Sequence, residues 1–247
     1  MQTVLITGAS SGIGKATVTL LAASGYNLVI CGRNTDALAA LQQLYPGNIS
    51  HILQFDISKK DEVFSAIQSL SDLRIDILIN NAGNAHGLAT FDQADITDLE
   101  AMIDINVKGL IYVSKAVLPL MIPYGSGHIV NISSIAGKQV YLNGTTYCAS
   151  KFAVEALTQG MRIDLLPHNI KVTGIAPGAV ATNFSLVRFK GDQSRANAVY
   201  EGYTPLSAED VANTILFAIR QPEHVQIADL TVLPSVQASA VHISRKV

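Results

Sequence analysis

Tyr147 and Lys151 are the residues whose types and spacing point most directly to chemistry. They lie four residues apart in a segment, residues 143–166, whose pattern predicts a helix. Four residues make about one helical turn, so both side chains project from one face and can reach the same bound molecule. A nearby ammonium favours the phenolate, so the pair could give or take a proton near neutral pH. A helical tyrosine packed on a lysine stem has the same spacing, and the rest of the chain must decide.

A glycine-rich turn near the beginning of the chain could hold a phosphate. Apolar residues 4–6 predict a strand and residues 15–24 a helix that ends at Gly25. Glycines between them let the backbone approach a pyrophosphate, while helix N–H groups point at its charge. The alternative is an ordinary strand-to-helix turn. The spacing G-x-x-x-G-x-G differs from the usual G-x-G-x-x-G. The predicted phosphate-binding residues are Gly8, Ser10, Ser11, Gly12, Ile13 and Gly14.

The end of the second predicted strand, residues 27–30, favours NADP as the cofactor. In dinucleotide-binding folds this point faces the adenosine ribose, where a carboxylate suits NAD and an arginine suits the 2′-phosphate of NADP. Here Gly32 and Arg33 stand in place of the acid. A surface arginine at the start of a helix that continues to residue 45 is the alternative.

Further ligand-binding candidates follow the next strands. Asp56 and Ile57 come after residues 49–55 and could contact an adenine, although Asp56 could also cap a helix over residues 59–70. Small residues after a fourth strand, residues 75–79, leave room for a ligand; they are Asn81, Ala82 and Gly83 with Asn80. Asn106 lies within a predicted helix over residues 97–121, where it could mark a kink bonded to backbone or hold a water.

The second half of the chain continues the alternation of strand and helix. Residues 127–132, 171–176 and 226–232 predict strands, and residues 207–220 a helix with a Ser-x-x-Asp capping signal. Ser133 and Ser134 follow the fifth strand, where open α/β sheets place ligands. Residues 183–205 show no clean period, which predicts a lid. We therefore expect one domain, residues 1–247, with a doubly wound, Rossmann-type parallel sheet of about seven strands and helices on both faces.

Composition limits the partners. With a net charge of −2 and no run of Lys or Arg, we expect no nucleic-acid partner. No apolar run is long enough to span a bilayer and no charged leader precedes the first strand, so we expect a cytoplasmic protein. Cys31 and Cys148 have no metal-ligand spacing, so we expect free thiols. The 49% hydrophobic content and mean hydropathy of +0.31 favour a partly covered surface, as in an oligomer, although many small residues would have the same effect.

Together these motifs resemble the short-chain dehydrogenase/reductase family, and the likeness extends over essentially the whole chain. The glycine spacing that departs from the usual fingerprint is the one this family uses. The matching residues are Thr7 to Gly14, Asp56, Asn80 to Gly83, Asn106, Ser134, Tyr147, Lys151, Pro177, Gly178 and Thr182.

The resemblance implies a role for each of these residues. Tyr147 would be the general acid/base, Lys151 would lower its pKa and bind the nicotinamide ribose, and Ser134, thirteen residues before Tyr147, would hold the substrate oxygen. Asn106 would anchor a water that links Lys151 to solvent. The implied cofactor contacts after the sixth strand are Pro177, Gly178, Val180 and Thr182, of which Thr182 would meet the carboxamide. A homotetramer is the family expectation.

A narrower resemblance, in the lid and in Leu233, Pro234 and Gln237, is to NADP-dependent 3-hydroxy acid dehydrogenases that also oxidise serine and L-allo-threonine. Physically, Arg188 in the lid could bind a substrate carboxylate with its two-pronged guanidinium. The alternative is that Arg188 and Lys190 are solvated lid charges. A reductase for uncharged or carrier-linked substrates, and a non-catalytic NADPH-binding regulator, remain as rival functions.

Overall fold

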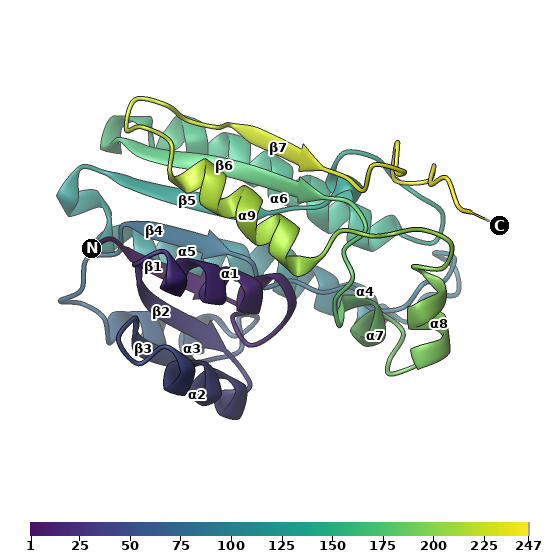
Figure 1. The fold of residues 1–247 in the computed structure, drawn as a ribbon, viewed down its shortest axis with the longest axis horizontal. Helices are drawn as coiled ribbons and strands as arrows, with labels where there is room; N and C mark the ends of the chain where they lie inside the picture. The colour runs from purple at the N-terminus through teal and green to yellow at the C-terminus, as the bar shows by residue number, and fades with distance from the viewer. Residues whose placement is uncertain (247) are drawn as a thin grey trace.

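The computed structural model describes residues 1–246, and within them seven parallel strands form one sheet in the order β3-β2-β1-β4-β5-β6-β7 (Figure 1). The strands are β1 (Thr3–Thr7), β2 (Asn27–Gly32), β3 (Ile49–Gln54), β4 (Ile77–Asn80), β5 (Gly127–Ile132), β6 (Ile170–Pro177) and β7 (Asp229–Val232). The predicted doubly wound α/β fold is confirmed. Strands β4 and β7 begin two and three residues later than the sequence pattern indicates, because pairing with β1 starts at Ile77 and pairing with β6 starts at Asp229.

Helices cover both faces of the sheet. On one face lie α1 (Gly12–Ala23), α2 (Thr35–Leu44) and α9 (Ala208–Ile219), and on the other α3 (Lys60–Gln68), α5 (Leu110–Val117) and α6 (Thr145–Asp164) (Figure 1). Along β1, Val4 and Ile6 face the first group while Leu5 faces the second. Alternate side chains of a strand point to opposite faces, so a strand buried on both faces reads as continuously apolar.

The helix predicted over residues 97–121 is not continuous. It consists of α4 (Ile96–Ile103), a π-helical segment η1 (Asp104–Gly109), α5 and the 3-10 turns η2 (Leu118–Leu120) and η3 (Ile122–Tyr124). Both 3-10 turns carry a proline in their first turn, which removes an N–H donor and prevents the α-helix from continuing. The segment around Asn106 is thus a local distortion of the helix, and its cause lies in contacts of the site described below.

Two short helices occupy residues 183–205, the segment without a clean period that the sequence predicts as a lid. They are α7 (Phe184–Arg188) and α8 (Gln193–Ala198), and they lie beyond the arrowhead ends of the strands (Figure 1). The Asp192 carboxylate caps α8 by accepting from the backbone N–H of Arg195. Helices of five and six residues are too short to show an amphipathic period, which explains why the sequence pattern misses them.

Helix ends agree better with the sequence. Gly25 follows α1 with φ of +81°, and Ser207 and Asp210 form the predicted capping box at the start of α9. None of the helices within residues 1–246 combines the length and the apolar character that crossing a bilayer requires.

Candidate active site

A cavity of about 1040 Å³ lies at the carboxyl ends of the strands, and residues of the predicted lid segment, 183–205, form part of its lining. It brings together residues that are far apart in the sequence. The predicted site residues that line it are Gly8, Ser10, Ser11, Gly12, Ile13, Arg33, Asp56, Ile57, Asn81, Ala82, Gly83, Ser134, Tyr147, Lys151, Pro177, Gly178, Val180, Thr182 and Arg188. Gly14 and Asn106 do not line it, and each packs against a glycine that does, Gly8 and Gly83 respectively.

The glycine turn between β1 and α1 has the shape that a dinucleotide needs. Gly8 and Gly12 have φ of +64° and +50°, in the left-handed region that favours glycine. A Cβ on Gly14 would lie 2.2 Å from the carbonyl oxygen of Gly8, so α1 begins directly against the turn. Ser11, at the N-cap, makes no side-chain capping bond, which leaves the first N–H groups of α1 for an anion. The turn therefore fits a pyrophosphate.

Arg33 and Asp56 form the edge of the cavity next to this turn. The guanidinium of Arg33 is 3.6 Å from the Asp56 carboxylate. Burial alone would raise the pKa of Asp56, but hydrogen bonds from Ser58 and the charge of Arg33 bring it below its ordinary value. The predicted capping role of Asp56 is wrong, because α3 begins at Lys60 with Lys59 at its N-cap. Asp56 instead closes a turn onto the N–H and hydroxyl of Ser58.

Ser134, Tyr147 and Lys151 meet on the opposite wall. Ser134 precedes the 3-10 turn η4 (Ile135–Gly137), and its hydroxyl accepts from the N–H of Ala136 at 3.1 Å. Helix α6 carries both other residues on one face, as their spacing predicts. The Lys151 amine donates to the carbonyl of Ile132 at 3.0 Å and lies 6.0 Å from the centre of the Tyr147 ring. Tyr147 itself is buried.

Burial dominates the electrostatics around Tyr147. It raises the pKa of Tyr147 above its ordinary value and Tyr141 acts in the same direction, while Ser134 and Arg188 oppose them. Burial lowers the pKa of Lys151 to about 8. The lowering of the tyrosine pKa that the resemblance implies for Lys151 stays a prediction; in this arrangement the Lys151 amine donates to the carbonyl of Ile132.

Arg188 reaches from α7 into the cavity. Its Nε donates to the carbonyl of Gly87 at 3.1 Å and its Nη1 to the hydroxyl of Tyr141 at 3.0 Å. Its guanidinium carbon lies 5.7 Å from the centre of the Tyr147 ring. Lys190, the second lid cation, is not part of the lining. Arg188 is therefore not a solvated lid charge, and its remaining N–H groups are available to an anion beside Tyr147.

Asn106 marks a kink bonded to backbone, the first of the two roles that the sequence left open, and its part in holding a water stays a prediction. Its Oδ1 accepts from the N–H of Asn84 at 2.8 Å, and its Nδ2 donates to the carbonyl of Asn84 and to Ser150. A Cβ on Gly83 would lie 3.1 Å from this Oδ1 and 3.3 Å from the Lys151 amine. The π-helical turn thus holds Asn106 against Gly83, next to the Lys151 amine.

A family model of the short chain dehydrogenases matches residues 2–192. The chain belongs to this family. It is 41% identical over 239 residues to a sulfoacetaldehyde reductase of Chromohalobacter salexigens, with 95% of this chain and 94% of that protein covered. It is 38% identical over 252 residues to an NADP-dependent 3-hydroxy acid dehydrogenase of Schizosaccharomyces pombe, with 99% and 97% covered. The closed form of a serine dehydrogenase complexed with NADP+ superposes with a TM-score of 0.92 at 36% identity, covering 99% of this chain and all of that one.

Several residues of this short-chain dehydrogenase line the cavity without having been predicted from the sequence. They are Asn84, His86, Tyr141, Tyr203 and Arg245 among others. Tyr141 could have been suspected from its place between Ser134 and Tyr147, since a short turn had to return the chain to the same wall. Gln237, which the narrower resemblance includes, also lines the cavity. Arg245 comes from the tail after β7, and no local sequence pattern indicates that the tail reaches the cavity.

Proposed function

We propose that this short-chain dehydrogenase transfers a hydride between NADP(H) and the hydroxyl-bearing carbon of a small 3-hydroxy acid, such as serine, L-allo-threonine or 3-hydroxypropionate. The observation that carries the proposal is the Arg188 guanidinium, which lies in one cavity with Ser134, Tyr147 and Lys151. NADP supplies the hydride acceptor in oxidation and the donor in reduction. The chain's own residues bind the two molecules and move the proton.

The glycine turn binds the pyrophosphate of the cofactor, with Gly14 supporting it from behind. Arg33 binds the 2′-phosphate, and its 71% exposed side chain is free to swing from Asp56 to a phosphate. Asp56 and Ile57 contact the adenine, Lys151 the nicotinamide ribose, and Thr182 the carboxamide. Relatives named as NADP-dependent support this choice of cofactor.

Tyr147 takes the proton of the substrate hydroxyl during oxidation and returns it during reduction, and Ser134 holds the same oxygen. Asn106 supports a water that links Lys151 to solvent. This proton relay argues against a non-catalytic NADPH-binding regulator, because a sensor needs the glycine turn and Arg33 but not Ser134, Tyr147 and Lys151 together.

The anion-binding role of Arg188 favours a charged substrate over an uncharged or carrier-linked one. A carboxylate and a sulfonate are both oxyanions, and both occur in substrates named for relatives of this chain, 3-hydroxy acids and sulfoacetaldehyde. In each of these molecules the anionic group lies within a few bonds of the carbon that gains or loses a hydride. A guanidinium fixed near Tyr147 suits that separation.

A panel of substrates tests the function. Serine, L-allo-threonine and 3-hydroxypropionate are offered with NADP+ or NAD+, and sulfoacetaldehyde and uncharged ketones of similar size with NADPH or NADH, following the absorbance of the reduced cofactor. We expect turnover of the small anionic substrates with NADP+ or NADPH. Turnover confined to the uncharged ketones would contradict the anionic substrate, and stoichiometric NADPH binding without turnover of any compound would favour the regulator.

Replacing Arg188 with alanine should raise KM for the anionic substrate about thirtyfold, because one or two charge-assisted hydrogen bonds are lost. The change should be within about threefold for an uncharged ketone. Lys190→Ala is the matched control, since it removes the other lid cation, which pairs with Asp98 at 2.8 Å and does not line the cavity. Equal losses on charged and uncharged substrates would count against anion binding by Arg188.

We also propose that residues 1–247 form one catalytic domain with residues 183–205 as its lid, and that it works as a homotetramer in the cytoplasm. Apolar side chains exposed on α6 and α9, Phe152, Ile163 and Phe217, suit burial between subunits. The two cysteines are free and buried, which suits a reducing compartment. Light scattering after size exclusion should return about four times the chain mass of 26.3 kDa, and a monomer would contradict the assembly.

A further inference from the structure

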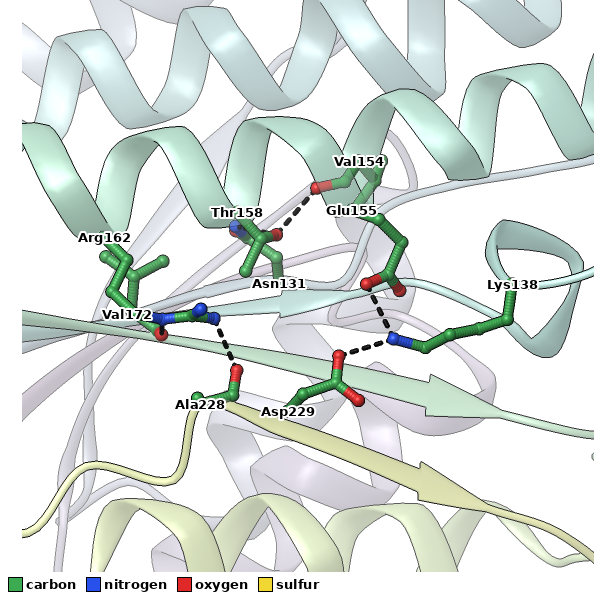
Figure 2. A network of polar contacts seen from close by, with 9 residues as sticks. All are labelled: Asn131, Lys138, Val154, Glu155, Thr158, Arg162, Val172, Ala228 and Asp229. Carbon is green, nitrogen blue, oxygen red and sulfur yellow. Dashed lines mark hydrogen bonds and ion pairs between the residues drawn. The ribbon is translucent and has the colours of Figure 1, made fainter.

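Lys138, Glu155 and Asp229 form a charge network (Figure 2). The Lys138 amine lies 2.9 Å from the Glu155 carboxylate and 2.6 Å from that of Asp229. The network therefore joins three segments: the turn after η4, helix α6 and the first residue of β7. For the hydride transfer proposed above, on which this inference rests, we propose that Glu155 is a positioning residue that holds the Ser134 turn against α6 and keeps the Lys151 amine charged.

A polar stripe on α6 faces the sheet, and Glu155 is part of it. Its members recur at helical spacing and are Lys151, Glu155, Thr158 and Arg162. Arg162 donates to the carbonyls of Val172 and Ala228, which anchors the far end of the helix on β6 and on the residue before β7 (Figure 2). Polar contacts thus fix where α6 sits along the sheet, and with it the place of Lys151.

Burying the Glu155 carboxylate costs desolvation free energy. Its side chain is only 9% exposed, and its Oε1 has no hydrogen-bond partner within residues 1–246. A buried carboxylate with one cationic neighbour contributes little net stability compared with a well-packed apolar side chain. Its charge is therefore better explained by an effect on a neighbouring group than by stability alone.

Lys151 is that neighbour. It lies four residues before Glu155 on the same face of α6, and the carboxylate opposes the lowering of the Lys151 pKa by burial. Asn106, which approaches from η1, carries no charge. The charged group that acts on the Lys151 pKa is Glu155, and Lys138 joins Glu155 to Asp229 of β7. Tyr147 on the same helix lies next to the Lys151 amine, and Tyr141 and Arg188 act on Tyr147.

The turn that carries Ser134 is pressed onto α6 at Gly137. A Cβ on Gly137 would lie 2.7 Å from the carbonyl oxygen of Lys151. Ser134 precedes this contact by three residues and Lys138 follows it directly. The bond from Lys138 to Glu155 therefore closes the turn over the helix, so the place of the Ser134 hydroxyl depends on it.

Two substitutions with opposite expected signs test the proposal. The first measurement is the dependence of kcat on pH for NADPH-dependent reduction, in which kcat falls on the high-pH side, the basic limb. Glu155→Gln should move this basic limb about one pH unit lower, because Lys151 loses a neighbouring carboxylate. Lys138→Met should move it upward by a similar amount, because the Glu155 charge is no longer offset. The double variant should fall between them. A purely structural role would lower kcat without producing shifts of opposite sign.

A second measurement follows Lys151 without turnover. Acetic anhydride labelling of the cofactor-free protein at a series of pH values, with mass spectrometry of the Lys151 peptide, should give the same order of pKa values. Asp76→Asn is the matched control: its 12% exposed carboxylate pairs with Arg74 at 2.6 Å, in the segment that leads into the amino end of β4. It should change neither the basic limb nor the labelling of Lys151.

Shifts of the same sign, or none, in folded Glu155→Gln and Lys138→Met would overturn the inference. If Glu155→Gln does not fold, Lys138→Met tests the inference by itself. A basic limb that does not move to higher pH in Lys138→Met would overturn it. If the unchanged protein turns over no substrate, the proposed function fails, while the labelling series still decides whether Glu155 and Lys138 control Lys151.

Discussion

Replacing Tyr147 with phenylalanine should lower kcat at least about a thousandfold, because the proton transfer loses its donor and acceptor. Binding of NADPH should stay within about twofold. The ring itself is retained, and it packs with Met102 and Cys148 in a small buried cluster and lies 5.6 Å from the ring of Phe184. A phenylalanine fills the same space, so the fold of the wall is preserved.

The measurement pairs steady-state kinetics with a titration of NADPH fluorescence, which is free of tryptophan background because the chain contains no tryptophan. Tyr26→Phe is the matched control, since Tyr26 is a buried tyrosine in the core on the α1 side of the sheet. Activity of Tyr147→Phe within tenfold of the unchanged protein would refute the proposed mechanism.

Replacing Gly14 with alanine should weaken NADPH binding at least about a hundredfold and destabilise the protein by about 1–3 kcal/mol. The added Cβ would meet the carbonyl oxygen of Gly8 at 2.2 Å and the side-chain amide of Asn81 at 2.6 Å. The first of these atoms belongs to the backbone, so the turn between β1 and α1 must move. That movement disturbs the N–H groups that are proposed to bind the pyrophosphate.

Gly47→Ala is the control for this substitution. Gly47 lies in the turn between α2 and β3, and a Cβ there has no neighbour within 4 Å. Alanine restricts the unfolded chain more than glycine, so this variant should keep its stability or gain up to about 1 kcal/mol, and bind NADPH unchanged. Thermal unfolding and NADPH titration of both variants give the comparison. Equal NADPH affinity in Gly14→Ala and the unchanged protein would contradict the proposed cradle.

The parts of the site that the sequence predicts are those with local spacing. Tyr147 and Lys151 share a face because a helical turn dictates it, and Gly8 and Gly12 adopt the left-handed conformations that their turn requires. Arg33 falls at the cavity because the end of β2 opens onto it. These inferences need only one element each, so no knowledge of distant contacts enters.

The parts that were missed depend on distant contacts. The π-helical turn forms around the bonds of Asn106 to Asn84, which lies 22 residues earlier. Asp56 is the exception, because the contact that replaces helix capping is local: Ser58, two residues later, donates to its carboxylate. The pKa of Tyr147 depends on the burial of its ring and on Arg188, which comes from another segment of the chain. A helical period or a capping pattern contains none of this information.

The shared lysine of the Lys138 network also restricts how such a chain can diverge. Loss of Lys138 alone would leave the buried carboxylate of Glu155 without its cationic partner. Loss of Glu155 alone would leave Lys138 paired with Asp229, which is 42% exposed. A single substitution at either position therefore gives a protein in which one charge of the network lacks its partner. Substitutions at these positions should therefore accumulate as coordinated sets, and a redesign that grafts the turn after Ser134 from another protein would have to carry the matching residue of α6 with it.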